Sequence, residues 1–574
     1  MNKMCALLGA APLMILLAAC TVTKPAVMSE PTRVPAAERP ALSSVELTED
    51  VMYDILLGEI AGHRGQFDTA ITSLARVAQK TRDPRLAERA TLAAVYAKRY
   101  DDALNTANLW VELEPVSNKA HEQLASVLLE LGRPHEAQLN FKKMLSIAAK
   151  GQPKGHTYRR IASVLARHQN RKVAMEIMQA LVDLDRASPS AYFALAHLAV
   201  RTDNLDTATE AASRALELKP DWEEAALFKA GILVSRKDSV KAQAFYEDYL
   251  ASHPQATQLR LNYARYLVDL KQWEKAREQF MGVLKTSPDD ADTMYALGLL
   301  SLQTNRIDEA ERYFKSVLEL RPDDQQMLLY LGQVGEDRKD YAQAERWYRQ
   351  VVLGEHYFEA QTRLGVVIAK QGDLEGARKH LQGIQSQSEE QRVQLVLAEE
   401  QILREAKQYP EALEILNGAL EGLPDNKDLL YARALIGEKL DRVDLTERDL
   451  RVILKQEPDN AQALNALGYT LADRTTRYEE ALEFIERALA LKPDDPFILD
   501  SMGWIQYRLG NTSEAIKFLK RALSIRNDAE ISAHLGEVLW VTGDRTQARS
   551  VWNKALEDTP DSEALHGVIK KFNP

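Results

Sequence analysis

Two histidine–glutamate pairs come nearest to a metal site in this chain. The pairs that start at His121 and His135 both begin like the zinc motif H-E-x-x-H, in which two histidines one helical turn apart hold the metal. Ala125 and Leu139 occupy the places of the second histidine, so neither pair completes the motif. The sequence also contains no G-x-S-x-G elbow, P-loop or G-x-G-x-x-G motif. We therefore expect no enzyme activity, no metal and no cofactor.

Cys20 is the residue with the clearest chemical role. A short basic start (residues 1–3) precedes an apolar run (residues 6–17), and the run ends in Leu17-Ala18-Ala19-Cys20. An apolar stretch of this length is too short to span a bilayer and is typical of a secretory signal. Its ending resembles the bacterial lipobox, which implies that residues 1–19 are a signal peptide and that Cys20 receives a diacylglyceryl group. The alternative is an ordinary signal peptide with an incidental cysteine.

Residues 20–45 combine four prolines with no apolar periodicity, and we interpret them as an extended tether of roughly 75 Å. The prolines are Pro25, Pro31, Pro35 and Pro40. Thr21 rather than aspartate follows the cysteine, and by resemblance to lipoprotein sorting signals this favours the outer membrane over the inner one. We expect a lipid-anchored protein on the outer membrane that faces the periplasm.

A ladder of alanines shows which elements the chain builds beyond the tether. Its steps are 33 to 37 residues, five consecutive steps are 34, and Thr446 stands where one alanine is missing. A fixed period near 34 residues indicates stacked helix–turn–helix units. The ladder consists of Ala70, Ala103, Ala137, Ala174, Ala208, Ala242, Ala276, Ala310, Ala344, Ala377, Ala412, Ala481, Ala515 and Ala548.

Two further ladders run in phase with the alanines. A proline recurs where the second helix of a unit should end, because proline cannot continue the helical hydrogen bonding. A small residue recurs about twelve positions before most alanines, and we expect it to face the alanine where two helices approach closely. A large residue three or four positions after the alanine is expected to fill the gap to the next unit, as in Phe280, Phe314, Tyr348, Leu416, Phe518 and Trp552.

Residues 295–322 (YALGLLSLQTNRIDEAERYFKSVLELRP) carry these positions at the spacing of the tetratricopeptide repeat, and the chain resembles that family. The resemblance implies an all-α fold, a right-handed superhelical solenoid of about 14 units over residues 46–560, with a capping helix in residues 561–574. The pattern departs at residues 150–156, which lengthen one connection, and at 377–412, where Glu400 replaces the small residue. We expect distorted units there.

The charge of the chain excludes one class of partner. The formal net charge is −11, and no basic stripe is visible, whereas nucleic-acid binding requires clustered lysine and arginine. What remains is recognition of other proteins. In a repeat of this family the first helix lines a concave groove, which implies a set of groove-facing side chains suited to an extended peptide. They are Asn262, Arg265, Tyr295, Tyr330, Gln333, Arg363, Asn465, Tyr469, Trp504, Tyr507, His534 and Trp540. The alternative is that several of the rings pack between helices.

The first helix of the solenoid has no preceding unit to cover it. Residues 44–61 carry apolar side chains at helical spacing, among them Val51, Met52, Ile55 and Leu56, and Ser44 is a plausible N-cap. We hypothesise that this end helix docks a partner protein. The alternative is that it only caps the first unit.

Lipobox, tether and repeats together resemble proteobacterial outer-membrane lipoproteins, most of all the lipoprotein adaptors of periplasmic carboxyl-terminal processing proteases. The resemblance implies a scaffold that holds the protease together with its substrates, cell-wall hydrolases, and promotes proteolysis without catalysing it. A pilotin-like assembly factor for a secretin, pilus or export complex is the alternative. Neither the oligomeric state nor the repeats that contact each partner follow from the sequence.

Overall fold

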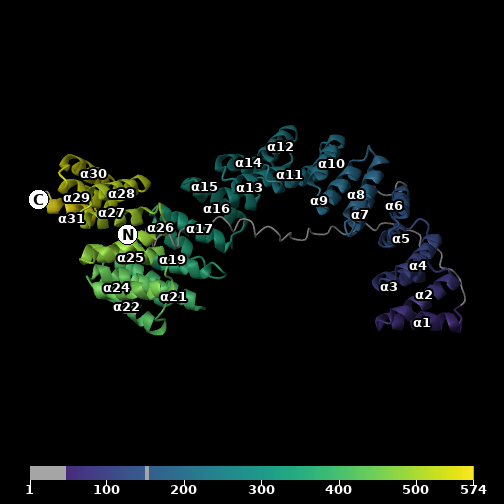
Figure 1. Ribbon diagram of the computed structural model, residues 1–574, viewed down its shortest axis with the longest axis horizontal. Coiled ribbons are helices and arrows are strands. Elements are labelled where there is room, and N and C mark those ends of the chain that lie inside the picture. The colour runs from purple at the N-terminus through teal and green to yellow at the C-terminus, as the bar shows by residue number, and fades with distance from the viewer. Residues whose placement is uncertain (1–46, 149–153, 573–574) are drawn as a thin grey trace. The chain divides into compact units, whose positions relative to one another are not determined.

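The structure is a computed structural model, and it describes residues 47–148 and 154–572. The predicted signal peptide, Cys20, the tether and Ser44 lie outside the described residues, as does much of the 150–156 insertion. All regular structure in the described ranges is helical (Figure 1). This confirms the all-α fold class.

The helices follow one another with short connections. Those before residue 264 are α1 (Glu49–His63), α2 (Phe67–Thr81), α3 (Pro84–Tyr96), α4 (Tyr100–Leu113), α5 (Asn118–Glu130), α6 (Pro134–Ala148), α7 (Lys154–Leu165), α8 (Arg171–Asp183), α9 (Pro189–Arg201), α10 (Leu205–Leu218), α11 (Glu223–Ser235) and α12 (Ser239–Ser252), with α13 (Thr257–Asp269) at the boundary. Those after it are α14 (Trp273–Thr286), α15 (Ala291–Gln303), α16 (Ile307–Leu320), α17 (Gln325–Asp337), α18 (Tyr341–Tyr348), α19 (Tyr357–Lys370), α20 (Leu374–Gln382), α21 (Glu389–Glu405), α22 (Tyr409–Gly422), α23 (Lys427–Lys439), α24 (Val443–Gln456), α25 (Ala461–Arg474), α26 (Tyr478–Leu491), α27 (Pro496–Arg508), α28 (Thr512–Ile525), α29 (Ala529–Val541), α30 (Arg545–Asp558) and α31 (Glu563–Phe572).

The chain forms two compact units that divide between Tyr263 and Ala264, within α13. In both units successive helices pair, as α1 with α2 and α25 with α26, and each pair packs on the next. Helices α1 to α12 and α15 to α30 make fourteen such pairs in the described chain. The pair of α23 and α24, which has Thr446 in place of the alanine, is one of them.

The alanine ladder lies on the second helix of each pair, and all fourteen alanines are completely buried. Thr446 is buried in the same position, and its hydroxyl donates a hydrogen bond of 2.9 Å to the carbonyl of Ala434. Only a small side chain fits at this closest approach, since interiors are packed to crystal density. The predicted role of the ladder in helix pairing is confirmed.

The small residue faces the ladder alanine as predicted at some positions, but another contact is closer: a Cβ at Gly468 or Gly503 would lie 3.0 or 3.2 Å from the carbonyl oxygen of that alanine and nearer still to a large side chain. A Cβ at Gly298 would lie 2.3 Å from the ring of Phe314, and one at Gly332 would lie 2.1 Å from the ring of Tyr348. The small residue therefore admits the large residue of its own pair, four positions beyond the ladder alanine. At Gly503 that residue is Leu519, and the half-buried Phe518 was the wrong choice. The same arrangement recurs at Gly58, Gly365, Gly468 and Gly536.

The helix ends follow from the residues that flank them. Asp290, Asp324 and Asn460 cap first helices by accepting backbone N–H hydrogen bonds with their side chains, which satisfies donors that the helix leaves unpaired. The ladder prolines stand two residues beyond the ends of second helices, as predicted. They are Pro220, Pro254, Pro288, Pro322, Pro424, Pro458, Pro493 and Pro560.

Two second helices in succession are short. Helix α18 has 8 residues and α20 has 9, whereas α16 and α22 have 14 each. The irregularity therefore begins at α18, earlier than residues 377–412, for which the sequence pattern predicts distorted units. Glu400 is completely buried at the small position of α21, and Arg404 donates a hydrogen bond of 2.7 Å to its carboxylate.

The last helix closes the second unit. Leu565 and Val568 of α31 are buried against α29 and α30, which is the position that the prediction of a capping helix requires. Across 47–148 and 154–572, none of the helices is both long enough and apolar enough to cross a membrane.

Candidate protein-binding surfaces

Helix α1 leaves one apolar face uncovered. Its N-cap is Thr48, whose hydroxyl accepts a hydrogen bond of 3.4 Å from the N–H of Val51, so the helix begins later than Ser44 would have placed it. Val51 is buried against α2 and α3 with Leu74 and Leu86, and Ile55 is half-buried on the same cluster. These two predicted docking residues therefore cap the first pair.

The other two predicted residues of the end helix point outward. Met52 is 49% exposed and Leu56 is 54% exposed. Tyr53 (65%) and Ile60 (49%) continue the same face, although the sequence analysis did not name them. Their spacing from Leu56, three residues before and four after, was the available signal. We call Met52, Tyr53, Leu56 and Ile60 the α1 face.

The predicted groove residues on α13 are both exposed. The hydroxyl of Tyr246 donates a hydrogen bond to Oδ1 of Asn262, and the rings of Tyr246 and Tyr263 stack at 4.7 Å between centroids. Arg265 lies on the next turn of the helix.

The next groove residues contact one another. The hydroxyls of Tyr295 (α15) and Tyr330 (α17) lie 3.4 Å apart, and the ring of Tyr330 stacks on Phe314 at 5.2 Å. Burial raises the pKa of Tyr295 above its ordinary value. Both rings are half-buried between repeats, as the alternative interpretation expected.

Arg363 is held by its own neighbours. Its guanidinium lies 3.2 Å from Glu336 and 3.1 Å from Glu359, and the side chain is buried. Gln333 donates a hydrogen bond of 3.3 Å to the same Glu359. Both predicted donors are therefore bound to carboxylates within unit 2. Glu336 and Glu359, which are 27 and 4 residues before Arg363 in the sequence, both contact its guanidinium.

The last groove residues form a second cluster, on α25, α27 and α29. His534 donates from Nδ1 to Asp500 at 3.0 Å, and its ring stacks on Trp504 at 4.3 Å. The hydroxyl of Tyr469 lies 3.4 Å from Nε2 of His534. Burial opposes the charged imidazolium, but the attraction of Asp500 prevails and raises the pKa of His534 to about 9.

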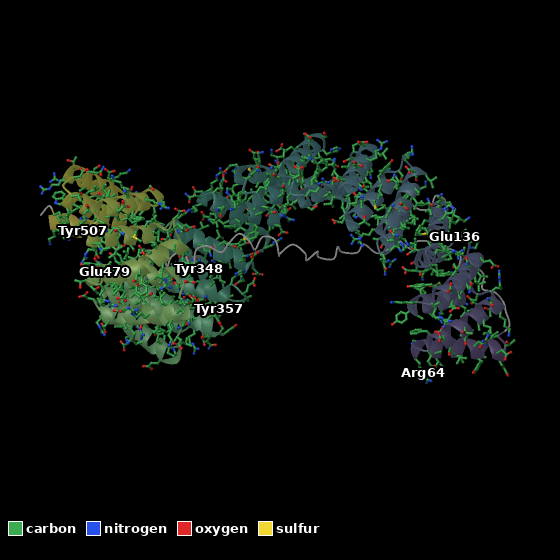
Figure 2. All side chains as sticks on the ribbon, in the orientation of Figure 1. Arg64, Glu136, Tyr348, Tyr357, Glu479 and Tyr507 are labelled. Carbon is green, nitrogen blue, oxygen red and sulfur yellow. The ribbon has the colours of Figure 1, made fainter. Side chains whose placement is uncertain are left out.

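Two further predicted rings lie at the edge of this cluster. The centroid of Tyr507 is 5.3 Å from that of Trp504, and Figure 2 shows Tyr507 among the last helices of unit 2. Trp540 instead stacks on Trp552 at 5.6 Å and contacts Phe572 at 6.2 Å. The structure therefore places Trp540 with the C-terminal closure.

Four carboxylates that the sequence analysis did not single out lie among these rings. They are Glu438 (α23), Asp473 (α25), Asp500 (α27) and Glu530 (α29). Burial raises the pKa of Glu438 and prevails over the charges around it, because the attraction of Lys439 and Arg474 opposes the repulsion of Glu530 and Asp473. Asp473 accepts a hydrogen bond of 3.2 Å from Nε1 of Trp504. We call these carboxylates and the rings of Tyr431, Tyr469 and Trp504, together with Asn465, the acidic groove.

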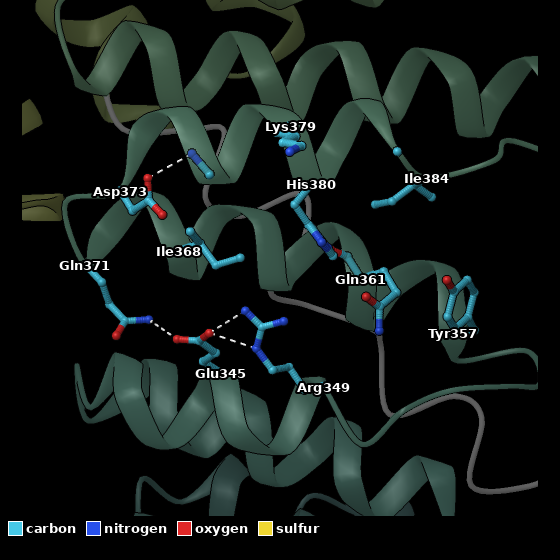
Figure 3. Close-up of a pocket in the computed structure, with 12 residues that line it drawn as sticks. Glu345, Arg349, Tyr357, Gln361, Ile368, Gln371, Asp373, Lys379, His380 and Ile384 are labelled. Carbon is cyan, nitrogen blue, oxygen red and sulfur yellow. Dashed lines mark hydrogen bonds and ion pairs between the residues drawn. The ribbon is translucent and has the colours of Figure 1, made fainter.

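A polar notch opens where α18 and α20 are short (Figure 3). It encloses about 600 Å³ between α18, α19 and α20. Glu345 accepts hydrogen bonds from Arg349 at 2.6 Å and from Gln371 at 2.7 Å. Nε2 of His380 donates to the carbonyl of Gln361 at 2.9 Å, and burial lowers the pKa of that histidine. The polar groups of the notch thus bind one another.

The histidine of the first incomplete zinc motif has a structural place. His121 is buried, with its ring nitrogens 3.1 Å from the carbonyl of Pro115 and 2.8 Å from Oδ1 of Asn140. In the described part of the chain, no three histidine, cysteine, aspartate or glutamate side chains gather in a way that could hold a metal ion.

Comparisons with known proteins point to one repeat type. Two family models, both described as tetratricopeptide repeat, match residues 193–257, 261–324 and 295–356 in one case and 459–528 in the other. TPR repeat-containing protein PA4667 of Pseudomonas aeruginosa is 34% identical over 492 residues, which cover 85% of this chain and 82% of that protein. Human tetratricopeptide repeat protein 13 is 28% identical over 28% of this chain and 19% of its own length. Among solved structures, the hetero-tetramer Cut9-Hcn1 of the APC/C aligns over 86% of this chain and 97% of that chain, with 16% identity and a TM-score of 0.30.

Proposed function

The chain belongs to the tetratricopeptide repeat family, whose repeats form protein-interaction scaffolds, and on that premise we propose that it is an adaptor for proteolysis. In this proposal it holds a periplasmic carboxyl-terminal processing protease together with the protease's substrates, cell-wall hydrolases. It promotes their cleavage and leaves the catalysis to the protease.

The α1 face is the observation that carries the proposal. Single exposed apolar residues are common on soluble proteins, but four large ones on one face of one helix are characteristic of a docking surface. Each is at least 49% exposed, while Val51 and Ile55 on the opposite face hold the helix in place. A rigid helix with an apolar face suits helix-in-groove recognition by a partner.

An adaptor needs a second surface for the second protein. The acidic groove is more than 370 residues further along the chain than the α1 face, and it belongs to unit 2. Two proteins bound to one scaffold meet at an effective concentration set by the scaffold, which accelerates their reaction without new chemistry.

The anchor completes the proposal. Leu17-Ala18-Ala19-Cys20 supports lipidation at Cys20 and attachment to the periplasmic face of the outer membrane. A diacylated cysteine with a further acyl chain provides the two or more lipid chains that stable anchoring requires.

The test is a pull-down from periplasmic extract with the chain carrying Cys20→Ser, read by mass spectrometry. We expect a processing protease together with peptidoglycan hydrolases. Leu56→Asp should abolish capture of the protease without unfolding the chain. Leu139→Asp is the matched control, because Leu139 is 51% exposed on α6, away from the α1 face. The Leu139→Asp variant should capture the protease normally.

Two outcomes would contradict the adaptor proposal. Recovery of secretin or pilus components in place of a protease would identify the chain as an assembly factor. Equal capture by the Leu56→Asp and Leu139→Asp variants would show that the α1 face is not the docking surface.

A further inference from the structure

Helix α1 keeps the register of the later first helices. Asp50 lies eight residues before Gly58, just as Asp290, the N-cap of α15, lies eight residues before Gly298. The same spacing separates the N-cap aspartate from the small glycine in α17 and α27. The residues of α1 can therefore be compared, position by position, with those of first helices that have a unit before them.

Two positions of the α1 face are buried in the later units. Tyr53 and Ile60 lie five residues before and two residues after Gly58, and they are 65% and 49% exposed. The side chains at the same two offsets in α15, α17, α27 and α29 are at most 3% exposed. They are Thr293, Leu300, Met327, Val334, Ile498, Ile505, Ile531 and Val538.

The preceding helix pair covers the position of Tyr53 in those units. Ile498 of α27 shares a small buried cluster with Leu464 of α25 and Ala488 of α26. Ile531 of α29 lies in the equivalent cluster with side chains from α27 and α28. The α1 face is therefore the surface by which one unit stacks on the unit before it, and among the described residues no unit precedes α1.

Other parts of this chain are poor occupants of the α1 face. Each second helix from α2 to α10 and from α14 to α30 already packs on the helix that follows it. The four prolines of residues 20–45 leave no proline-free stretch as long as one of these second helices. Helix α31 turns a polar face outward, as a terminal cap does. Its exposed side chains include Glu563, His566, Lys570 and Lys571.

We propose that the protein docked on the α1 face contributes a pair of packed helices, which stack on α1 as a preceding repeat would and cover Tyr53 and Ile60 with small and branched apolar side chains. This inference rests on the proposed adaptor function and specifies how the first partner binds. A helix satisfies its own backbone hydrogen bonds, whereas an extended segment would bury unpaired N–H and C=O groups against an apolar surface.

Hydrogen exchange of a grafted chain tests whether a helix pair fits this face. The graft is a second copy of residues 460–493, which contain α25 and α26. In the chain used for the pull-down it replaces the two residues before Glu49. Pro493 of the copy then stands five residues before Tyr53, the spacing that separates Pro493 from Ile498. We expect about tenfold slower exchange in α1 than in the ungrafted chain.

Two variants of the grafted chain make this result specific. Tyr53→Asp places a charge in the contact and should remove the protection of α1. Tyr53→Ile gives the graft the side chain that α26 meets in α27, so it should protect α1 at least as well as tyrosine does. Unchanged exchange of α1 in both the Tyr53 and the Tyr53→Ile grafted chains would overturn the inference.

A photocrosslinker identifies what lies on the face in periplasmic extract. The ungrafted chain carries Tyr53→p-benzoylphenylalanine, and the control carries the same residue at Leu139, which is 51% exposed on α6. Position 53 should crosslink to a partner segment with apolar residues at intervals of three and four, the pattern of an amphipathic helix. Position 139 should not crosslink to that segment.

Crosslinks from position 53 to a segment without helical spacing, to a second copy of this chain or to residues 20–46 would overturn the inference. Such a result leaves the adaptor proposal standing if the pull-down still recovers the protease. Failure to recover the protease while the graft protects α1 would contradict the adaptor proposal and leave the stacking surface intact.

Discussion

Gly298 is a position at which one added methyl group tests the packing of a helix pair. A Cβ there would lie 2.3 Å from Cε1 of Phe314 and 2.7 Å from its Cδ1. The ring has no room to move, because it is completely buried and stacked on Tyr330 at 5.2 Å. Overpacking of a core costs about 1–3 kcal/mol, while alanine gains about 1 kcal/mol over glycine inside a helix. We therefore expect Gly298→Ala to destabilise the pair α15/α16 by about 0–2 kcal/mol.

Gly418 provides the matched control. It lies inside α22, and a Cβ added there has no heavy atom within 4 Å. Gly418→Ala should therefore stabilise its helix by about 1 kcal/mol. The two substitutions are chemically identical, so the difference of about 1–3 kcal/mol between them isolates the clash with Phe314.

Hydrogen exchange read by mass spectrometry is the appropriate assay, because repeat arrays unfold locally and one global free energy is not well defined. Gly298→Ala should speed exchange in α15 and α16 and leave α22 unchanged. Adding Phe314→Leu, which removes the crowded ring, should restore much of the protection. If Gly298→Ala slowed exchange in α15 as Gly418→Ala slows it in α22, the pairing of small residue and ring would be refuted.

Three further predictions concern charged groups in unit 2. The folded pKa of His534 is about 9, above an unfolded value of about 6.5. Its pairing with Asp500 therefore stabilises α27 and α29 fully below pH 6.5, by about 3 kcal/mol, and this stabilisation is lost as pH rises through 9. Hydrogen exchange of the His534→Gln variant should lack that pH dependence. Arg433→Met removes the guanidinium 2.6 Å from the buried Asp449 and leaves Arg448, at 3.1 Å, as its remaining partner. It should therefore cost less than the loss of all compensation, about 1–3 kcal/mol, measured as faster exchange in α23 and α24, and recovery is expected when Asp449→Leu is added. The pKa of Glu438 is higher in the folded chain than in the unfolded chain, so ionisation of Glu438 opposes folding at pH values above its unfolded pKa. Glu438→Gln should therefore stabilise α23 at pH 7 and have no effect at pH 3. The measure is the urea concentration at the midpoint of local unfolding, followed by hydrogen exchange.

The period of the sequence predicts which residue types recur in each unit, but not which side chains they contact. The buried alanines, the prolines two residues beyond second helices and α31 all follow from spacing, since every unit repeats one local geometry. The contact between Gly298 and the ring of Phe314 did not follow from the period. The large residue stands three or four positions after the alanine, and the period does not decide which of these two adjacent side chains enters the helix pair. At Gly503 that ambiguity separates Phe518 from the correct Leu519.

The candidate surfaces were predictable to different degrees. The outward face of α1 can be derived from helical spacing, although Tyr53 and Ile60 were missed. Of the two carboxylates that hold Arg363, Glu359 lies four residues before it on α19 and follows from helical spacing, whereas Glu336 comes from α17 and could not be derived. The acidic groove depends on contact between Tyr469 and His534 across two repeats, and this requires the curvature of unit 2, which no local pattern encodes.

The short helices α18 and α20 have a mechanical consequence. A stack of equal helix pairs resists bending, and this resistance depends on the length over which each second helix packs on its neighbours. Helices α18 and α20 have 8 and 9 residues where α16 and α22 have 14, so each packs on its neighbours over a shorter length. Under a pulling load, bending should concentrate at residues 341–382. A partner bound to later repeats would then change its orientation while the repeats themselves stay folded.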